Sequence, residues 1–235
     1  MNGTFILTKN KDDSIDNKTS QIICLTELIY ILPKNLLEYY VRNGLFEKEL
    51  IEWCKQLCSK DKNMLDIGAH TGTYSISLSQ HCNTVYAFEP QRMIYYSLCG
   101  SVALSNIKNV HCKNVGLGSP DQVGSLKING ISLDGGGATI HAPPNNAMIL
   151  YKEDIEIITL DSLNLDNIGF IKIDVENNEL QVLQGAVQTL ERSNYPKILF
   201  EMNETNNDLI QFLNELHYKI IRVSYNNMFL AEYVQ

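Results

Sequence analysis

The stretch Asp66-Ile67-Gly68-Ala69-His70-Thr71-Gly72 follows a short apolar run and precedes a segment with helical spacing. Glycines at such a turn let the backbone approach a ligand closely, and the first turn of the helix offers free N–H groups. The dinucleotide-binding pattern G-x-G-x-x-G would need glycine at the positions of His70 and Thr73. The stretch therefore predicts a ligand-binding strand–turn–helix and disfavours NAD. Tight packing of the strand on the helix is the alternative interpretation.

The sequence around this stretch repeats a strand–helix pattern, which is typical of a parallel α/β sheet. The strands that we expect are Asn63–Ile67, Thr84–Phe88, Val110–Asn114, Ile155–Thr159 (an extra or edge strand), Phe170–Ile173 and Lys197–Phe200. The end of the chain differs, because Tyr218–Ser224 and Met228–Val234 form two strand patterns around the turn Tyr225-Asn226-Asn227. We therefore predict a mostly parallel sheet that closes with an antiparallel hairpin and carries helices on both faces.

Four of the predicted strands end in an acid, namely Asp66, Glu89, Asp174 and Glu201. Ligands of an open parallel sheet bind outside the carboxyl ends of its strands, so we expect these acids to line one crevice. Glu89 follows the glycine stretch by about 20 residues, the spacing at which an acid accepts hydrogen bonds from ribose hydroxyls in dinucleotide-binding folds. A turn residue before Pro90 is the alternative role for Glu89.

The chain before Asn63 has helical rather than strand periodicity. Apolar residues recur at spacings near three and four in Ile22–Leu32 and Leu36–Leu57, with breaks at Pro33 and Asn43-Gly44. We expect residues 1–62 to form a lead-in of two or three helices that cap the crevice or pack on its flank. Residues 63–235 then form the α/β domain, and the whole chain makes one compact unit.

Composition excludes several kinds of partner. The 235 residues are 44% hydrophobic and carry a net charge of −8, which argues against broad binding to nucleic acid or to an anionic membrane. We expect a neutral or locally docked substrate, and a monomer or a dimer. No segment approaches the roughly 20 apolar residues that span a bilayer. The start, Met1–Thr19, lacks the basic and apolar regions of a signal peptide.

The six cysteines show no paired C-x-x-C spacing, so neither a disulfide framework nor a zinc site is expected. Reduced thiols fit a cytoplasmic protein, in the host cytoplasm if the chain is viral. Between Ile128 and Leu150 lies a long connection with Gly135-Gly136-Gly137 and Pro143-Pro144. Its length indicates a flexible lid or substrate loop rather than a plain connection.

Several sequence blocks carry a resemblance to a known family. The spacing D-x-G-x-x-x-G of Asp66–Gly72 is similar to the first motif of class I methyltransferases, whose loop passes the methionine part of S-adenosylmethionine. The blocks Thr159–Leu163, Ile171–Glu176, Glu179–Ala186 and Ile198–Glu201 resemble the FkbM-type methyltransferases in residue type and order. Together these blocks cover roughly Asn63 to Glu201, and their shared order makes the resemblance more specific than any single block.

This resemblance implies a Rossmann-like methyltransferase fold with a seven-stranded sheet and S-adenosyl-L-methionine as cofactor. It also implies O-methylation of a hydroxyl group on a sugar or glycan, for example a deoxyhexose, or on a glycosylated metabolite. The family pattern I-K-I-D-V-E-G has Asn177 in place of its glycine here. Asparagine tolerates left-handed backbone conformation, so the turn can survive, but a close approach of the backbone to a ligand becomes doubtful at this position.

The cofactor site is expected to combine the glycine stretch with the next strand ends. Asn114 and Val115, at the end of the third strand, would flank the adenine. The residues that we expect to bind the cofactor are Asp66, Gly68, Ala69, His70, Gly72, Glu89, Pro90, Asn114, Val115 and Asp174.

Methyl transfer to an alcohol calls for alignment and for a base near the hydroxyl group. Crowding of like charges at neighbouring strand ends raises the pKa of a carboxyl towards the useful range. We rank Asp174 first as base or cofactor-side acceptor, then Glu201, then Glu176. His70 and His141 are the alternative bases, since imidazole titrates near neutrality.

Other roles remain open for the acids. Asp174, Glu201 and Asn203 offer oxygen ligands for Mg²⁺ or Mn²⁺, although a metal is not predicted. Glu176 and Glu179 can instead stabilise the amino end of the next helix, and Asp161 is expected to cap a helix.

Competing functions are also considered. A DNA amino-methyltransferase would show an Asp/Asn-Pro-Pro-aromatic sequence after the fourth strand, where this chain has Asp174-Val175-Glu176-Asn177. Methylation of another small-molecule hydroxyl, or a non-catalytic cofactor-binding scaffold, are the remaining alternatives.

Overall fold

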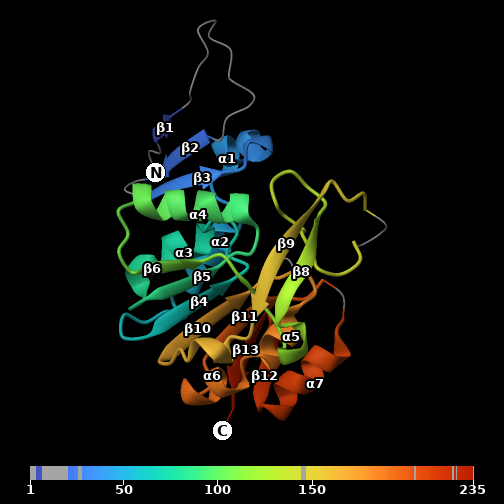
Figure 1. Cartoon of the computed structure of the whole chain (residues 1–235). Coiled ribbons are helices and arrows are strands. Elements are labelled where there is room, and N and C mark those ends of the chain that lie inside the picture. The colour runs from blue at the N-terminus through green and yellow to red at the C-terminus, as the bar shows by residue number, and fades with distance from the viewer. Residues whose placement is uncertain are drawn as a thin grey trace, which may run out of the picture.

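The computed structural model describes residues 4–6, 21–25, 28–143, 147–203, 205–223, 225 and 227–234. Its centre is a seven-stranded sheet with the order β12-β13-β11-β10-β4-β5-β6 (Figure 1). The strands are β4 (Asn63–Ile67), β5 (Val85–Phe88), β6 (Val110–Lys113), β10 (Ile168–Ile173), β11 (Lys197–Glu201), β12 (Tyr218–Arg222) and β13 (Met228–Tyr233). Strands β11 to β6 run parallel, whereas β13 is antiparallel to both β11 and β12. The predicted sheet with its closing hairpin is therefore confirmed.

Helices cover both faces of this sheet, as predicted. Successive residues of a strand point to opposite faces, so Phe170 of β10 packs in one core while Ile171 and Ile173 pack in the other. The first face carries α2 (Lys48–Cys54), α3 (Thr73–Leu78) and α4 (Arg92–Leu104), and the second carries α5 (Glu179–Gln184), α6 (Val187–Arg192) and α7 (Asn207–Glu215) (Figure 1). Strands buried on both faces appear in the sequence as continuous apolar runs, which is why these strands could be predicted.

A second, smaller sheet follows β6 in the chain. It contains β7 (Gly116–Leu117), β8 (Gly124–Gly130) and β9 (Tyr151–Ile158) in the order β7-β9-β8. The predicted extra strand at Ile155–Thr159 corresponds to the second half of β9, which extends this sheet and not the central one. The predicted long loop joins β8 to β9, and its residues 144–146 lie outside the described part of the chain.

The amino-terminal lead-in differs from the prediction. The segment Ile22–Leu32, expected to be a helix, instead contains β2 (Gln21–Leu25) and β3 (Leu28–Leu32), which pair antiparallel. Strand β1 (Thr4–Ile6) pairs with β2 on its other side. The prediction of a helix here was wrong because apolar residues crowd this segment, so that a helical spacing and an alternating one both fit.

Contacts with α4 explain why β3 is a strand. The backbone N–H groups of Ile29 and Ile31 donate to the hydroxyl groups of Ser105 and Ser101, at 2.7 and 2.8 Å. These two serines lie one turn apart at the end of α4, and Ser105 also donates to the carbonyl oxygen of Ile29. An unpaired strand edge needs such partners, and here a helix surface supplies them.

The rest of the lead-in is helical, as expected. Residues 34–36 form a short 3₁₀ turn, and α1 (Leu37–Asn43) and α2 follow it. None of the helices in the described ranges is long and apolar enough to cross a membrane. In the predicted hairpin turn, Asn226 lies outside the described residues, as does the preceding Ser224.

Candidate functional site

A cavity of about 320 Å³ lies at the carboxyl ends of β4, β5 and β10. Small-molecule sites typically measure about 300–1,000 Å³, so this cavity is at the lower end of that range. The sequence-predicted residues that line it are Gly68, Ala69, His70, Glu89, Pro90, Val115, Asp174 and Glu176. The predicted residues outside its lining are Asp66, Gly72, Asn114 and Glu201.

Gly68 lines the cavity, and its backbone passes very close to the residue that follows β10. A Cβ atom at this position would lie 1.8 Å from the carbonyl oxygen of Asp174, and the φ angle of Gly68 is +77°. The N–H groups of Gly68 and Ala69 both donate to the carbonyl oxygen of Phe88. Only glycine permits this approach of β4 to β10, so the glycine motif brings together the ends of three strands.

Glu89 is a buried carboxylate at the end of β5. Its Oε2 accepts from the backbone N–H of His70 at 2.9 Å, and its Oε1 accepts from the N–H of Gln91 at 2.8 Å. Burial raises the pKa of Glu89 to about 7. Each carboxylate oxygen can accept a second hydrogen bond, so Glu89 retains acceptor capacity for a ligand in the cavity.

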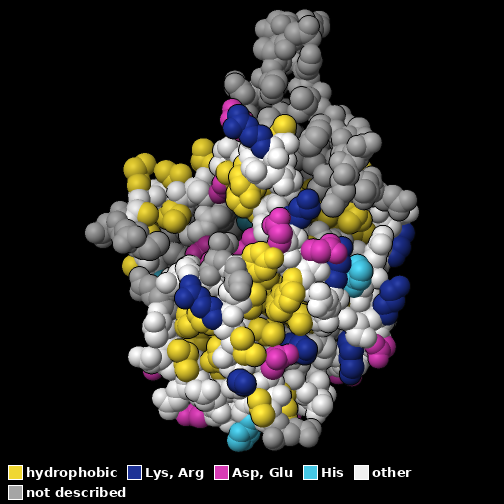
Figure 2. Space-filling view, turned by 180° about the vertical axis from the view of Figure 1, so that it is seen from behind, with side chains coloured by type: hydrophobic (Ala, Val, Ile, Leu, Met, Phe, Trp, Pro, Cys, Tyr) yellow, Lys and Arg dark blue, Asp and Glu magenta, His cyan; other side chains and the backbone are white. Residues whose placement is uncertain are grey.

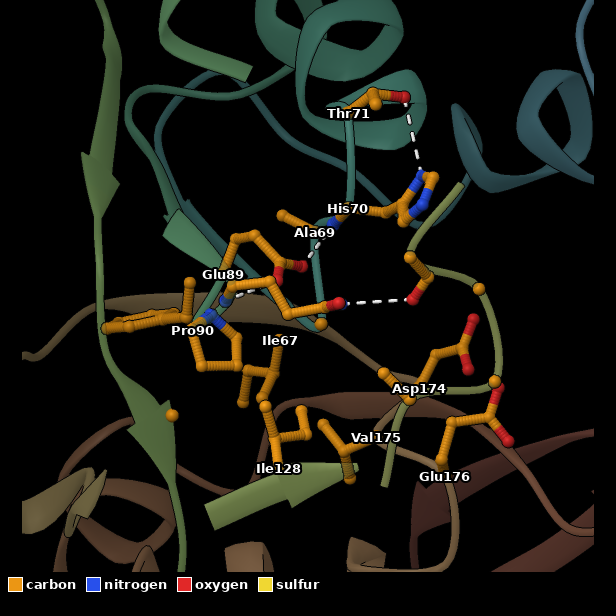
Figure 3. A pocket seen from close by; sticks show the side chains of 18 of the residues that line it. Ile67, Ala69, His70, Thr71, Glu89, Pro90, Ile128, Asp174, Val175 and Glu176 are labelled. Carbon is orange, nitrogen blue, oxygen red and sulfur yellow. Dashed lines mark hydrogen bonds between the residues drawn. The ribbon is translucent and has the colours of Figure 1, made fainter. Parts of the chain in front are cut away.

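His70 joins the glycine stretch to the loop between β8 and β9. It has a left-handed backbone, with φ 50°, and its Nε2 lies 2.7 Å from the carbonyl oxygen of Asp134. Because a carbonyl oxygen only accepts, this bond requires the proton of the ring on Nε2. Burial lowers the pKa of His70. In this arrangement Nε2 is a donor that holds the loop, which leaves only Nδ1, beside Thr71, as a basic atom (Figure 3).

The loop between β8 and β9, predicted to be a lid or a substrate loop, contributes to the lining of the cavity and is called the lid below. Residues 134–138 and Ile140 line the cavity, and side chains from other elements fasten the loop at several points. Gln91 donates to the carbonyl oxygen of Gly135 at 2.9 Å, and Thr139 donates to that of Glu176 at 2.9 Å. Asn35 donates to Asp134 Oδ2 at 2.8 Å, so the lead-in also holds this loop.

Asp66 does not reach the cavity. Its side chain is fully buried, and Oδ2 accepts from both the N–H and the hydroxyl group of Ser75, in the first turn of α3. Burial raises the pKa of Asp66. The structure thus places this acid as a cap for α3, although the sequence suggested a contact with the cofactor.

Gly72 and Asn114 are outside the lining of the cavity and contact residues that support it. Gly72, with φ +90°, leaves room for Leu98, whose Cδ1 would lie 2.5 Å from a Cβ atom at this position. Asn114 donates to the carbonyl oxygens of Glu89 and Pro90, both at 2.9 Å. It therefore fixes the backbone after β5.

The three candidate catalytic acids lie close together. Asp174, Glu176 and Glu201 each offer one carboxylate oxygen, and these oxygens all lie within 4.8 Å of one another. Figure 3 shows Asp174 and Glu176 together on one side of the cavity, opposite Pro90. Burial, followed by the charges of Asp174 and Glu176, raises the pKa of Glu201 to about 7. Asn203, which the sequence analysis offered as a possible metal ligand, donates to Glu201 at 2.9 Å.

Lys172 is a site residue that the sequence analysis missed. It lies on β10 next to Asp66 of β4, is buried, and its Nζ is 3.0 Å from Asp174 Oδ2. Its ammonium group also lies over the ring of Tyr74, 4.8 Å from the centroid, and Tyr74 donates to Glu47 at 2.8 Å. Burial lowers the pKa of Lys172, but the negative charges of Asp174, Asp66 and Glu47 outweigh this effect, so the pKa is raised. The available signal was a single lysine inside the apolar run of β10.

Two further walls of the cavity come from elements whose role the sequence could not show. The lead-in contributes Leu36, Tyr40 and Phe46, and burial together with the charge of Asp134 raises the pKa of Tyr40 to about 12. The smaller sheet contributes the apolar side chains of Leu117, Ile128, Ile155 and Ile157. His141, an alternative base, is outside the lining, and its Nε2 lies 3.3 Å from Asn178 Oδ1.

Comparison with models of protein families identifies the family of this chain. A model of the methyltransferase FkbM domain matches residues 66–220, well over half of the 235-residue chain. The chain belongs to the FkbM methyltransferase family. A comparison with curated protein sequences found no match.

Solved structures share the fold. The FkbM methyltransferase from Methylobacillus flagellatus KT is 18% identical with a TM-score of 0.53, over 82% of this chain and 46% of that one. This chain thus spans less than half the length of that protein. The precorrin-6y C5,15-methyltransferase from Geobacter metallireducens GS-15 is 14% identical with a TM-score of 0.53, over 87% and 94%. An rRNA methylase from Streptococcus thermophilus is 11% identical with a TM-score of 0.50, over 81% and 99%.

The turn after β10 has a left-handed backbone at Asn177, the position where the family pattern has glycine. Asn177 has φ 73° and the preceding Glu176 has φ 53°, so two consecutive residues are left-handed. Asparagine accepts this conformation more readily than most residues other than glycine. Asn177 is exposed and lies outside the cavity lining, which removes the doubt about a close approach to a ligand at this position.

The lining of the cavity suits S-adenosylmethionine. An apolar wall can take an adenine ring, Glu89 can accept from ribose hydroxyls, and a carboxylate-rich wall attracts a positively charged sulfur. The carboxylates in the lining are Glu47, Glu89, Asp134, Asp174 and Glu176. The residues present therefore fit the cofactor that the family uses.

Proposed function

We propose that this chain is an S-adenosylmethionine-dependent O-methyltransferase that acts on a hydroxyl group of a sugar or a glycosylated metabolite. The observation that carries the proposal is the cavity at the strand ends, which Gly68 and Glu89 line together with the carboxylates of Asp174 and Glu176. One side of the cavity supplies acceptors for a ribose, and the other supplies acceptors for the hydroxyl groups of a second substrate.

When bound, S-adenosylmethionine supplies a methyl group on a positively charged sulfur. The residues of the chain then have two tasks, which are alignment and removal of the hydroxyl proton. Asp174, Glu176 and Glu201 are our candidates for the proton acceptor, and one of their oxygens must come within about 2.6–3.2 Å of the hydroxyl. Asp174 and Glu176 line the cavity, whereas Glu201 is outside the lining, with a carboxylate oxygen within 4.8 Å of theirs.

The same three carboxylates offer hard oxygen ligands that could hold Mg²⁺ or Mn²⁺. Chelation separates this role from that of a base. EDTA should abolish turnover if a metal orients the acceptor, and it should leave turnover unchanged if a carboxylate alone takes the proton.

Isothermal titration calorimetry tests the cofactor. Wild-type protein should bind S-adenosylmethionine and not NAD, and Glu89→Ala should weaken binding by about tenfold to a hundredfold, because a hydrogen bond to a charged group contributes about 1.5–3 kcal/mol. Glu153→Ala is the matched control: Glu153 also accepts from a backbone N–H, that of Arg92, at 3.0 Å, but lies outside the lining. Equal affinities of wild type and Glu89→Ala would contradict the cofactor site.

A turnover screen tests the reaction. Purified protein is incubated with methyl-labelled S-adenosylmethionine and a panel of sugars, glycans and other small alcohols, with and without EDTA. Label should appear on a sugar hydroxyl. Transfer only to non-sugar alcohols would favour another small-molecule acceptor, and cofactor binding without any transfer would favour a non-catalytic scaffold.

A further inference from the structure

Phe46 presents a fixed aromatic ring at the mouth of the cavity. It lines the cavity and keeps 38% of its surface exposed. One face of its ring stacks on Tyr39, with centroids 4.0 Å apart and planes at 8°, and Tyr40 meets it edge-on at 5.4 Å and 86°. Because its neighbours already fix the ring, a ligand that packs on it loses little further conformational freedom.

The charge beside this ring is negative. Among the described lining residues, five are carboxylates and Lys172 is the one lysine or arginine. Lys172 is already paired with Asp174 at 3.0 Å, so its charge is not available to an anionic ligand. Field lines concentrate in such a low-dielectric cleft, so the cavity should repel a second negatively charged substrate.

We infer that the acceptor is a neutral pyranose ring that packs its apolar face on Phe46 and directs hydroxyl groups towards Asp174 and Glu176. Uronic acids, sugar phosphates and nucleotide-activated sugars are excluded by their charge. This inference rests on the proposed function and names the substrate class for the same site.

The pairing of an aromatic ring with carboxylates distinguishes a sugar from other alcohols. A pyranose has an apolar face of C–H groups and a rim of hydroxyl groups, so it can cover Phe46 and donate to the acids at once. A purely apolar alcohol would bring only its one hydroxyl donor to the carboxylates of Asp174 and Glu176 and would bury their remaining acceptors beyond the bond from Lys172 to Asp174, which is unfavourable. A phosphate group would add charge to a wall that already carries Glu47 and Asp134.

Ligand-observed NMR on the full chain saturated with S-adenosylhomocysteine measures acceptor binding without turnover. The probes are methyl α-L-rhamnopyranoside and methyl β-D-glucopyranoside, which are neutral, and methyl β-D-glucopyranosiduronate, which is anionic. At least one neutral pyranoside should bind and the uronate should not. Phe46→Ala should weaken binding of the neutral sugar about tenfold, the size of effect expected for a lost aromatic contact, while Phe46→Trp should keep it.

Tyr96→Ala is the matched control, since Tyr96 is an aromatic residue on α4 that is 56% exposed and outside the lining. It should leave sugar binding unchanged and should bind S-adenosylmethionine like the wild type. The inference is overturned if the uronate binds as tightly as the neutral sugars, if no neutral pyranoside binds, or if Phe46→Ala binds sugar normally. If the wild-type protein does not bind S-adenosylmethionine, the proposed function itself is overturned.

Discussion

Two aspartates in this protein cap helices to which they do not belong. Asp66 accepts from the N–H of Ser75 in α3, and Asp161 accepts from the N–H groups of Gln188 and Thr189 in α6. Each carboxylate therefore satisfies donors that the first turn of a helix leaves free. The cap expected at Asp161 is confirmed.

The same chemistry explains why the role of Asp66 could not be predicted. An acid at the end of a strand can face either the ligand crevice or the amino end of a helix, and the sequence pattern is identical in both cases. Glu89 and Asp174 directly follow strands of the central sheet, and Asp66 is the last residue but one of such a strand. Of these three acids, Glu89 and Asp174 line the cavity, whereas the side chain of Asp66 bonds to Ser75 of α3.

Lys172 supports the first residue-scale prediction. Lys172→Met should lower the free energy of unfolding by about 3–5 kcal/mol, because it leaves Asp174 and the fully buried Asp66 without their cation. Chemical denaturation at neutral pH measures this loss. The double variant with Asp174→Asn should cost less than the sum of the two single changes, since each single change strands an opposite charge.

Lys197→Met provides the matched control. Lys197 forms an ion pair with Glu232 at the same 3.0 Å, but its side chain is 46% exposed. This change should cost about 0–1 kcal/mol. Similar costs for Lys172→Met and Lys197→Met would show that the buried ion pair does not organise the site.

At the scale of elements, the lid and the turn after β10 meet above the cavity. Thr139 of the lid donates to the carbonyl oxygen of Glu176, a residue with a left-handed backbone. The five residues between β10 and α5 thus supply one of the points at which the lid is fastened. Sequence motifs located both elements but could not show that they touch.

Asn177 gives the prediction at this scale. Its φ of 73° strains a β-branched side chain, so Asn177→Val should lower the free energy of unfolding by about 1–3 kcal/mol and reduce turnover. Asn177→Gly should stay within about 1 kcal/mol of the wild type. Thermal and chemical denaturation measure both.

Asn214→Val controls for the loss of an exposed asparagine. Asn214 lies near the end of α7, where asparagine and valine have similar helix propensities, so its change should be nearly neutral. If Asn177→Val is as harmless as Asn214→Val, the left-handed turn is not required.

At the scale of the whole molecule, exposed charges lie on the edge strand β12 of the central sheet. The outer strand β12 carries the exposed charges of Lys219 and Arg222, which oppose pairing with another strand. Figure 2 shows the face opposite to that of Figure 1, where apolar side chains gather centrally with acidic and basic ones around them. The net charge of −8 does not exclude an apolar surface patch.

The sequence predicted the central sheet well and the covering elements poorly. Strands such as β4 and β10 are buried on both faces, so their apolar runs are unambiguous, and every predicted strand of the central sheet ends within two residues of the observed one. The walls formed by Phe46 and Ile155 depend on tertiary packing of the lead-in and of the smaller sheet. No local pattern encodes that packing, and β3 was mistaken for a helix for the same reason.

Buried acids make the stability of the molecule depend on pH. Glu179 at the start of α5 is 5% exposed, and burial raises its pKa from its usual value near 4.5 to about 7. Between these pH values the folded protein holds a proton that the unfolded chain has released. The contribution of Glu179 to stability is therefore fully present below about pH 4.5 and is lost as the pH rises through 7.

Glu179→Gln cannot ionise, so it should keep this contribution at all pH values. Its free energy of unfolding relative to the wild type should rise by up to about 3 kcal/mol between pH 5 and pH 8, since each unit of pKa shift corresponds to about 1.36 kcal/mol. Urea denaturation across this range measures the difference in free energy of unfolding between the variant and the wild type. The pH-dependent contributions of Glu89 and Glu201 cancel in this difference, because both proteins contain these residues. Glu191→Gln, an exposed change of equal charge on α6, should show no such rise. A flat difference for Glu179→Gln would mean that Glu179 is already ionised at pH 5 in the folded protein, held so by the N–H of Val175, which donates to its Oε1.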